Sequence, residues 1–150
     1  MKIDVSITKE VIRDRLRPPE VAGTAIGAWV EFRGLVRGEE AGRPIAALEY
    51  EAYSPMAETE IRRILTALGE VHPCLVARII HRVGVVRVGE AAIYAGIGAA
   101  HRGEALALLA AFMDRLKRDV PIWKRRAFEA AAVAAGCQAG PDTPLNSPSP

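Results

Sequence analysis

Apolar and polar residues alternate along short stretches of this chain, as they do in half-buried strands. The segment "KIDVSIT" (2–8) has this two-residue period, and "KEVIRDRL" after it predicts a short helix that ends at "RPPE". Strands are predicted again in "GTAIGAWVEF" (23–32) and "IAALEYEAY" (45–53), with a loop rich in glycine and charge between them. The chain therefore begins with a strand, a short helix and two more strands.

Two longer helices are predicted where apolar residues recur one helical turn apart. Ser54 stands as the N-cap of the first, and Pro55 occupies its first position, where proline is common. The second helix covers 101–119 and is stopped by Pro121. Its apolar face consists of Ala105, Leu109, Phe112 and Leu116.

The segments between and after these helices predict further strands. "CLVARIIHRVG" (74–84) and "EAAIYAGIGAA" (90–100) are joined by a short connection, which is typical of antiparallel neighbours. Another strand is predicted over 121–128, which includes most of "DVPIWKRR" (119–126). We therefore predict an α+β fold with a mostly antiparallel sheet and two long helices.

Composition suits one domain followed by a tail. The 150 residues are 50% hydrophobic, and a chain of this length buries roughly 68–70% of its unfolded surface. We assign 1–134 to the domain and 135–150 to a flexible C-terminal tail, because these last residues are small, rich in proline and nearly uncharged. A net charge of +2 argues against a general nucleic-acid coat, so any positive site must be local.

The two cysteines indicate neither a disulfide framework nor a metal site. Cys74 and Cys137 lie far apart without a CxxC motif, and neither stands in a basic stretch that would activate a thiol. No carboxylate pair or metal-ligand spacing stands out either. We expect a reduced, cytoplasmic protein with no metal and no cofactor, and we find no targeting signal or membrane-spanning run of about 18 apolar residues.

Positive charge is concentrated in residues 115–126, which hold six basic side chains and one acid. One explanation is that the cations complement the negative end of a helix, with Trp123 in the core. The other is an anion pocket. The pair His101 and Arg102 favours the pocket, because it lies where a strand is followed by a helix, and the free N–H groups of a helix start bind anions.

The loop "FRGLVRGEE" adds two arginines, Arg33 and Arg37, close to two glycines. Arginine forks suit phosphate oxygens, and glycine lets a backbone approach a ligand closely. From these residues alone, however, an ordinary hairpin connection is the preferred explanation of the loop.

Five motifs occur in the order and spacing of one known family: "FRGLVR", "LEYEAYSPMA", "IIHRVG", "AAHRGEA" and "LKRDVPIWKRR". Over about residues 27–125 the chain resembles the large, catalytic subunit of molybdopterin synthase, the MoaE family. The resemblance implies an α/β hammerhead fold and a homodimer. It also implies a heterotetramer, in which a small ubiquitin-like subunit docks at each end of that dimer.

The activity implied by the resemblance is that of a sulfurtransferase. In the family, the C-terminal Gly-Gly tail of the small subunit carries a thiocarboxylate and enters a pocket of the large subunit. Its sulfur is transferred to cyclic pyranopterin monophosphate, and two such transfers make the dithiolene of molybdopterin. Because sulfur arrives on the partner, the large subunit needs no reactive cysteine.

The resemblance also implies the residues of the pocket. Lys117 and Lys124 are the implied catalytic residues, and we give Lys124 the closer chemical role. The implied substrate-binding residues are Arg37, His101, Arg102 and Arg125. Cations suit this task because the pterin carries a cyclic phosphate and the tail ends in an anion. Arg126 departs from the family, which commonly has glutamate there.

Two other functions stay open at this point. A single-stranded nucleic-acid-binding module would use the basic residues 115–126, with Trp123 as a stacking platform, although no second aromatic side chain lies in that stretch. A noncatalytic scaffold of the same fold is the other alternative, and Arg126 in place of the family acid is the feature that favours it. The catalytic subunit accounts for more of the chain, and it requires neither nucleic acid nor a membrane.

Overall fold

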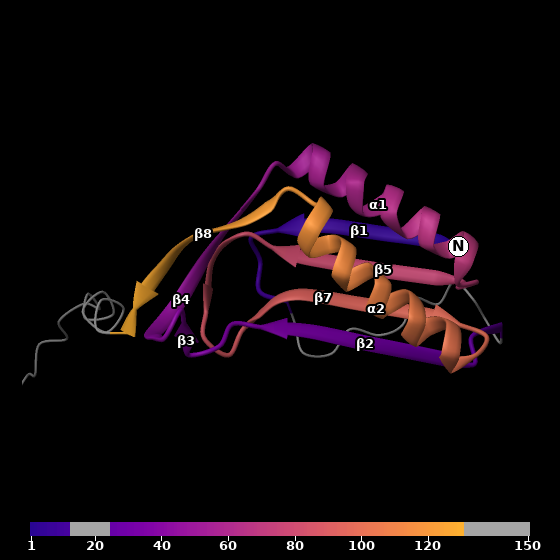
Figure 1. Ribbon diagram of the computed structural model, residues 1–150, viewed down its shortest axis with the longest axis horizontal. Coiled ribbons are helices and arrows are strands. Elements are labelled where there is room, and N and C mark those ends of the chain that lie inside the picture. The colour runs from indigo at the N-terminus through magenta and orange to yellow at the C-terminus, as the bar shows by residue number, and fades with distance from the viewer. Residues whose placement is uncertain (13–24, 131–150) are drawn as a thin grey trace, which may run out of the picture.

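The computed structural model describes residues 1–12 and 25–130, which form two β-sheets and two long helices (Figure 1). Most neighbouring strands are antiparallel. This confirms the α+β fold class predicted from the sequence. The predicted short helix after the first strand lies mostly outside the described residues, as does the predicted tail.

The larger sheet has the strand order β1-β5-β7-β2. Its members are β1 (Lys2–Thr8), β2 (Ala28–Leu35), β5 (Val76–Arg82) and β7 (Ala91–Ala99). β1 runs parallel to β5. Antiparallel neighbours joined by short connections were expected from the sequence, so this parallel pair was not predicted. This pairing requires a long crossover between the two strands, and the helix α1 lies within that crossover.

Both helices, α1 (Ser54–Val71) and α2 (Arg102–Asp119), cover one face of the larger sheet (Figure 1). The predicted apolar face of α2 is confirmed, since its four residues are buried in the main core. The predicted N-cap of α1 is wrong by one position, because Tyr53 caps the helix and its carbonyl accepts a bond from Ala57 N–H at 2.8 Å. Neither helix is apolar enough over its length to cross a membrane.

A smaller sheet is built around β4, whose strand neighbours are β3, β6 and β8. The four strands are β3 (Glu39–Glu40), β4 (Arg43–Ala52), β6 (Gly84–Arg87) and β8 (Ile122–Glu129). The strand predicted over 121–128 is therefore confirmed. The glycine-rich loop predicted before β4 contains the end of β2 and a tight hairpin, in which Ala41 and Gly42 both have positive φ (51° and 76°).

The chain passes from the larger to the smaller sheet directly after β5. Gly84 has φ +79°, a backbone conformation that favours glycine, and it begins β6. The corner is held by Arg82, which is buried and places one guanidinium nitrogen 2.6 Å from Glu90 Oε2. A second nitrogen of Arg82 donates to the Val85 carbonyl. These bonds fix the end of β5, and with it His81, where the two sheets separate.

Candidate functional site

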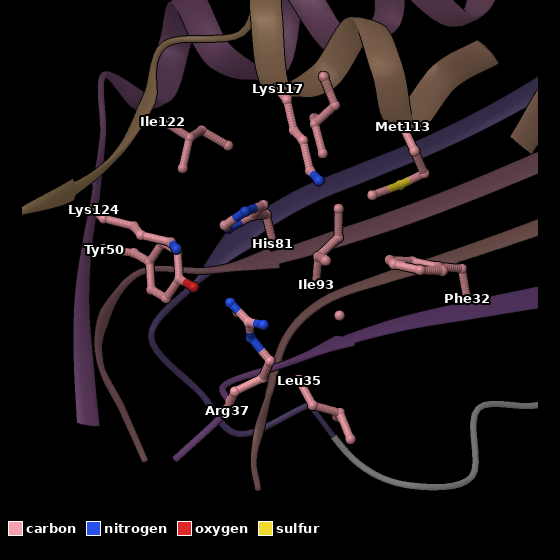
Figure 2. A pocket seen from close by; sticks show the side chains of 13 residues that line it. Phe32, Leu35, Arg37, Tyr50, His81, Ile93, Met113, Lys117, Ile122 and Lys124 are labelled. Atoms are coloured by element: carbon pink, nitrogen blue, oxygen red, sulfur yellow. The ribbon is translucent and has the colours of Figure 1, made fainter. Parts of the chain in front are cut away.

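A cavity of about 430 Å³ opens where the two sheets separate, beside the last turns of α2 (Figure 2). One part of its lining is apolar and consists of Phe32, Leu35, Ala92, Ile93, Met113, Leu116 and Ile122. The polar part consists of Arg37, Tyr50, His81, Lys117 and Lys124. A ligand bound in the cavity would therefore contact an apolar wall on one side and a cationic wall on the other.

Three cations predicted for the site meet in this cavity. Arg37 follows β2, Lys117 lies in the last turn of α2, and Lys124 belongs to β8 beyond Pro121. Figure 2 shows their nitrogen atoms directed toward one another across the cavity. Among the described residues, Arg37 and Lys117 form no ion pair, whereas Lys124 Nζ lies 2.7 Å from Glu40 Oε1. Two cations are thus available to an anionic ligand, and a third has one acidic partner.

The β8 strand separates two neighbouring cations. Ile122 and Lys124 both line the cavity, as the two-residue period of a strand requires. Arg125 lies at a β-bulge, where the register of β8 against β4 shifts between Glu49 and Tyr50. Its guanidinium Nε lies 2.8 Å from Glu51 Oε2, in a separate surface groove. Arg125, predicted to bind substrate, is therefore not brought into the cavity of this chain.

The remaining cations of residues 115–126 do not form one continuous surface. Arg115 and Arg118 both pair with Asp119, at 3.0 and 2.8 Å. Arg126 lies over the Phe128 ring, 4.7 Å from its centre, and does not line the cavity. Arg115 and Arg118 thus already share one acid of the protein, which leaves less unpaired charge for a nucleic-acid backbone.

Trp123 does not occupy the place that the helix-end explanation requires. Its side chain is 51% exposed, so the expectation of a core tryptophan is wrong. On the neighbouring strand β4, Trp123 pairs with Glu51. The indole therefore stands on the face of β8 opposite Lys124, away from the cavity.

His101 and Arg102 begin α2, as predicted, with His101 as the N-cap. Lys117 belongs to the last turn of the same helix, about 22 Å further along the axis at 1.5 Å per residue. His101 and Arg102 are both exposed, and neither lines the cavity. Within one chain, the helix therefore holds this pair and the lysine cavity at opposite ends.

Sequence reasoning did not assign two of the polar groups in the cavity, His81 and Tyr50. The His81 ring is buried, and Tyr50 meets its edge with 5.8 Å between ring centres. Burial lowers the pKa of His81, so the imidazole is neutral at neutral pH. Burial likewise raises the pKa of Tyr50, which keeps its phenol protonated. The motif "IIHRVG" contains His81 and was the only hint of it in the sequence. Whether His81 lines the cavity depends on where β5 ends, which the motif does not show.

The described residues contain no cluster of three or more histidine, cysteine or acidic side chains that could hold a metal. Cys74 is buried at the far side of the core from the cavity lining, beside Met1 and Gly69. Burial raises the pKa of its thiol, which disfavours the reactive thiolate. The chemistry available in the cavity is therefore that of cations, a phenol and a neutral imidazole.

Comparison with known proteins gives one consistent result. Residues 5–119 match the family described as "MoaE protein". The "Molybdopterin synthase catalytic subunit" of Homo sapiens is 36% identical over 136 residues, which cover 86% of this chain and 72% of that protein. The subunit of the same name from Pyrococcus abyssi is 41% identical over 105 residues, 70% of this chain and 71% of that protein.

Solved structures agree with this comparison. Molybdopterin synthase from Staphylococcus aureus superposes with a TM-score of 0.73 at 31% identity, covering 83% of this chain and 90% of that chain. The fold is also shared with a chain from the Helicobacter pylori complex of subunits 1 and 2 of molybdopterin-converting factor, at a TM-score of 0.64 and 20% identity. That match covers 85% of this chain and 89% of the other.

Proposed function

Because this chain belongs to the MoaE family, the molybdopterin synthase catalytic subunits, we propose that it transfers sulfur to cyclic pyranopterin monophosphate. The sulfur donor is the thiocarboxylated Gly-Gly terminus of a small ubiquitin-like subunit, and the product is the dithiolene of molybdopterin. The observation that carries this proposal is the convergence of Arg37, Lys117 and Lys124, from three separate segments, in one cavity.

The chemistry of the cavity suits both reactants. The pterin carries a cyclic phosphate and the partner's tail ends in a thiocarboxylate, so both need positive charge nearby. Arg37 can hold phosphate oxygens with two parallel hydrogen bonds, while the lysines act as mobile point charges. The apolar wall excludes water and so strengthens these electrostatic contacts. An extended tail ending in two glycines is thin enough to enter between the walls.

Lys124 takes the closer chemical role in this proposal, and Lys117 supports binding and proton transfer. Lys124 already donates a hydrogen bond to Glu40 Oε1, so an arriving anion has to compete for the same ammonium group. Lys117 has no partner among the described residues and is free to meet the anion first. Proton transfer between such an ammonium group and the reacting groups contributes about 10²- to 10⁴-fold to a rate.

His101 and Arg102 enter the proposal through a homodimer. The length of α2 keeps both away from the cavity of their own chain, so they can bind substrate only in the cavity of a second copy. With one small subunit on each chain, the assembly is a heterotetramer, which we place in the cytoplasm. A related fold is present in the two-subunit complex from Helicobacter pylori, which is the type of partnership proposed here.

Arg125 keeps a binding role outside the cavity. It lines an open groove together with Lys9 and Glu51, on the other side of β8 from Lys124. A tail that enters the cavity past β8 runs close to this groove. We propose that Arg125 contacts the partner's chain before its terminal glycines.

The decisive experiment combines the purified chain with a thiocarboxylated small subunit and cyclic pyranopterin monophosphate. Formation of molybdopterin is expected, and the same subunit with an ordinary carboxylate terminus serves as the control. Binding of the partner without any product would favour a noncatalytic scaffold. Micromolar binding of single-stranded oligonucleotides with a steep salt dependence, again without product, would favour the nucleic-acid module.

A further inference from the structure

The orientation of His81 in the cavity is set by a backbone hydrogen bond. Its Nδ1 lies 2.9 Å from the carbonyl oxygen of Arg82. A carbonyl oxygen can only accept a hydrogen bond, so Nδ1 carries the proton. In a neutral imidazole with Nδ1 protonated, Nε2 holds the free lone pair. The end of β5 therefore selects one tautomer of His81.

The lone pair of Nε2 is available to the cavity. Among the described residues, Nε2 has no hydrogen-bond partner, and it is not one of the buried polar atoms sealed off from solvent. The ring is part of the cavity lining, and Figure 2 shows it between the side chains of Lys117 and Tyr50 in that view. A small polar molecule in the cavity can therefore donate a hydrogen bond to His81.

The groups that face His81 keep it a proton acceptor. Lys117 comes from α2, Lys124 from β8, Arg37 from the segment after β2 and Tyr50 from β4. Three of these are cations, and one of them, Lys124, is hydrogen-bonded to an acid, Glu40 on β3. Burial lowers the pKa of His81 and so disfavours the imidazolium form, while the hydrogen bond to the Arg82 carbonyl acts in the opposite direction and is the smaller effect.

None of the other polar side chains in the described lining of the cavity can take this role. Lysine and arginine side chains offer only donors in their charged forms. The Tyr50 phenol stays protonated, since burial raises its pKa. His81 Nε2 is thus the one side-chain nitrogen in the described lining that can accept a proton near neutral pH.

We propose that His81 is a further catalytic residue, which accepts the proton of the water that frees the partner's C-terminus from sulfur. This inference rests on the proposed function. Once sulfur has bonded to the pterin, it still holds the partner's acyl carbon. Water oxygen forms a bond to that carbon, the carbon–sulfur bond breaks, and its electron pair stays on the sulfur as a thiolate. One water proton goes to His81 Nε2, the other is lost as the new carboxylic acid ionises, and nothing is oxidised or reduced.

Two substitutions separate this role from a structural one. His81→Asn places an amide nitrogen close to the position of Nδ1, where it can still donate to the Arg82 carbonyl, but leaves no acceptor at the position of Nε2. We expect single-turnover release of the partner's carboxylate to slow by on the order of 10²-fold or more, with docking of the partner unchanged. His81→Ala opens space for free imidazole, which should restore part of the rate.

The pH profile provides an independent test. A base with a lowered pKa is active above that pKa and loses activity as the pH falls through it, so the wild-type rate should decline only below about 6.5. His81→Asn should lose this acid limb. If His81 had only a structural role, His81→Asn would have a lower melting temperature but the same acid limb of the pH–rate profile as the wild type. Nitrogen NMR of the full wild-type chain should show His81 protonated at Nδ1, and protonation at Nε2 would overturn the inference.

Failure of this inference can be told apart from failure of the proposed function. If the wild-type chain makes no molybdopterin, the proposed function is wrong and the role of His81 is wrong with it. If the wild-type chain is active and His81→Asn keeps both its rate and its acid limb, only the inference about His81 is wrong. If the variant does not fold, the wild-type pH profile and the tautomer of His81 decide.

Discussion

Lys124, which lines the cavity, and Glu40 lie 84 positions apart in the chain and form an ion pair, with Nζ 2.7 Å from Oε1. The hairpin at Ala41 and Gly42 turns β3 back beside β4, and β8 pairs with the same strand. Both side chains are partly exposed, at 50% and 29%. Such a pair adds only about 0.2–1 kcal/mol to stability, so its main effect is to hold the Lys124 ammonium in place.

Replacing Glu40 by Gln should therefore alter substrate binding more than stability. The variant raises the positive charge of the cavity, so the KM for the phosphate-bearing pterin should fall by about 2- to 5-fold and become more sensitive to salt. The melting temperature should stay nearly constant. Glu39→Gln is the matched control, because Glu39 is exposed on the same two-residue strand and has no ion pair among the described residues. Equal effects of both substitutions would contradict a specific role for Glu40.

Removing either cavity lysine should slow catalysis severely without unfolding the chain. Lys124→Ala should slow single-turnover formation of molybdopterin by about 10²-fold or more, and Lys117→Ala should also be severe. Both side chains are exposed, so the free energy of unfolding should change by less than about 0.5 kcal/mol. The double variant should lose less than the product of the two single effects, because residues that act as a unit are not additive.

Lys2→Ala provides the control for these lysine substitutions, since Lys2 is an exposed residue of β1 that does not line the cavity. Its rate should equal that of the wild type. A near-normal rate for Lys124→Ala would remove this residue from the mechanism and leave the basic stretch as a charged edge.

A mixture of two inactive variants should recover activity if the second copy supplies Arg102. In a dimer of Lys117→Ala with Arg102→Ala, one cavity has both defects and the other has none. Random exchange of subunits then leaves about a quarter of all cavities intact, so about 25% of the wild-type rate should return. No recovery after verified subunit exchange would show that each cavity uses only residues of its own chain.

Acid stability should depend on a hydrogen bond on the opposite face of the larger sheet. The fully buried Tyr94 donates its hydroxyl to Glu31 Oε1 at 2.7 Å, and Trp29 Nε1 donates to the same oxygen at 2.9 Å. The Tyr94 bond is the largest cause of the lowered pKa of Glu31, and the Trp29 bond adds to it. A carboxylate whose pKa is lowered by folding stabilises the fold at pH values above its unfolded pKa of about 4.5. This stabilisation is lost as the pH falls through the lower pKa of the folded state.

Tyr94→Phe should therefore cost about 1–2 kcal/mol at neutral pH and flatten the loss of stability in acid. Urea unfolding followed from pH 7 down to pH 3 measures both effects. Tyr53→Phe is the control, because Tyr53 is 59% exposed and its hydroxyl has no hydrogen bond among the described residues. An unchanged slope in Tyr94→Phe would mean that Glu31 owes its lowered pKa to other groups.

Local patterns in the sequence determined much of the secondary structure, because periodicity reports which side of an element is buried. The apolar face of α2 and the strand after Pro121 were both predicted and both confirmed. Five motifs in the right order also identified the family, which the comparisons confirm. The parallel pairing of β1 with β5 could not be predicted in the same way, because strand partners are set by contacts between distant segments.

The membership of the cavity was decided only by tertiary structure. The two-residue period of a strand places Lys124 and Arg125 on opposite faces of β8, but only the packing of the sheets puts the face of Lys124 on the cavity and Arg125 beside Glu51. His81 lines the cavity because β5 ends where the sheets separate, and the hydrogen bond to the Arg82 carbonyl sets its tautomer. The sequence by itself determined which charges and rings the protein carries. Only the packing of its two sheets and α2 decided which of them share one space, because side-chain direction depends on bulges, turns and register that no local pattern records.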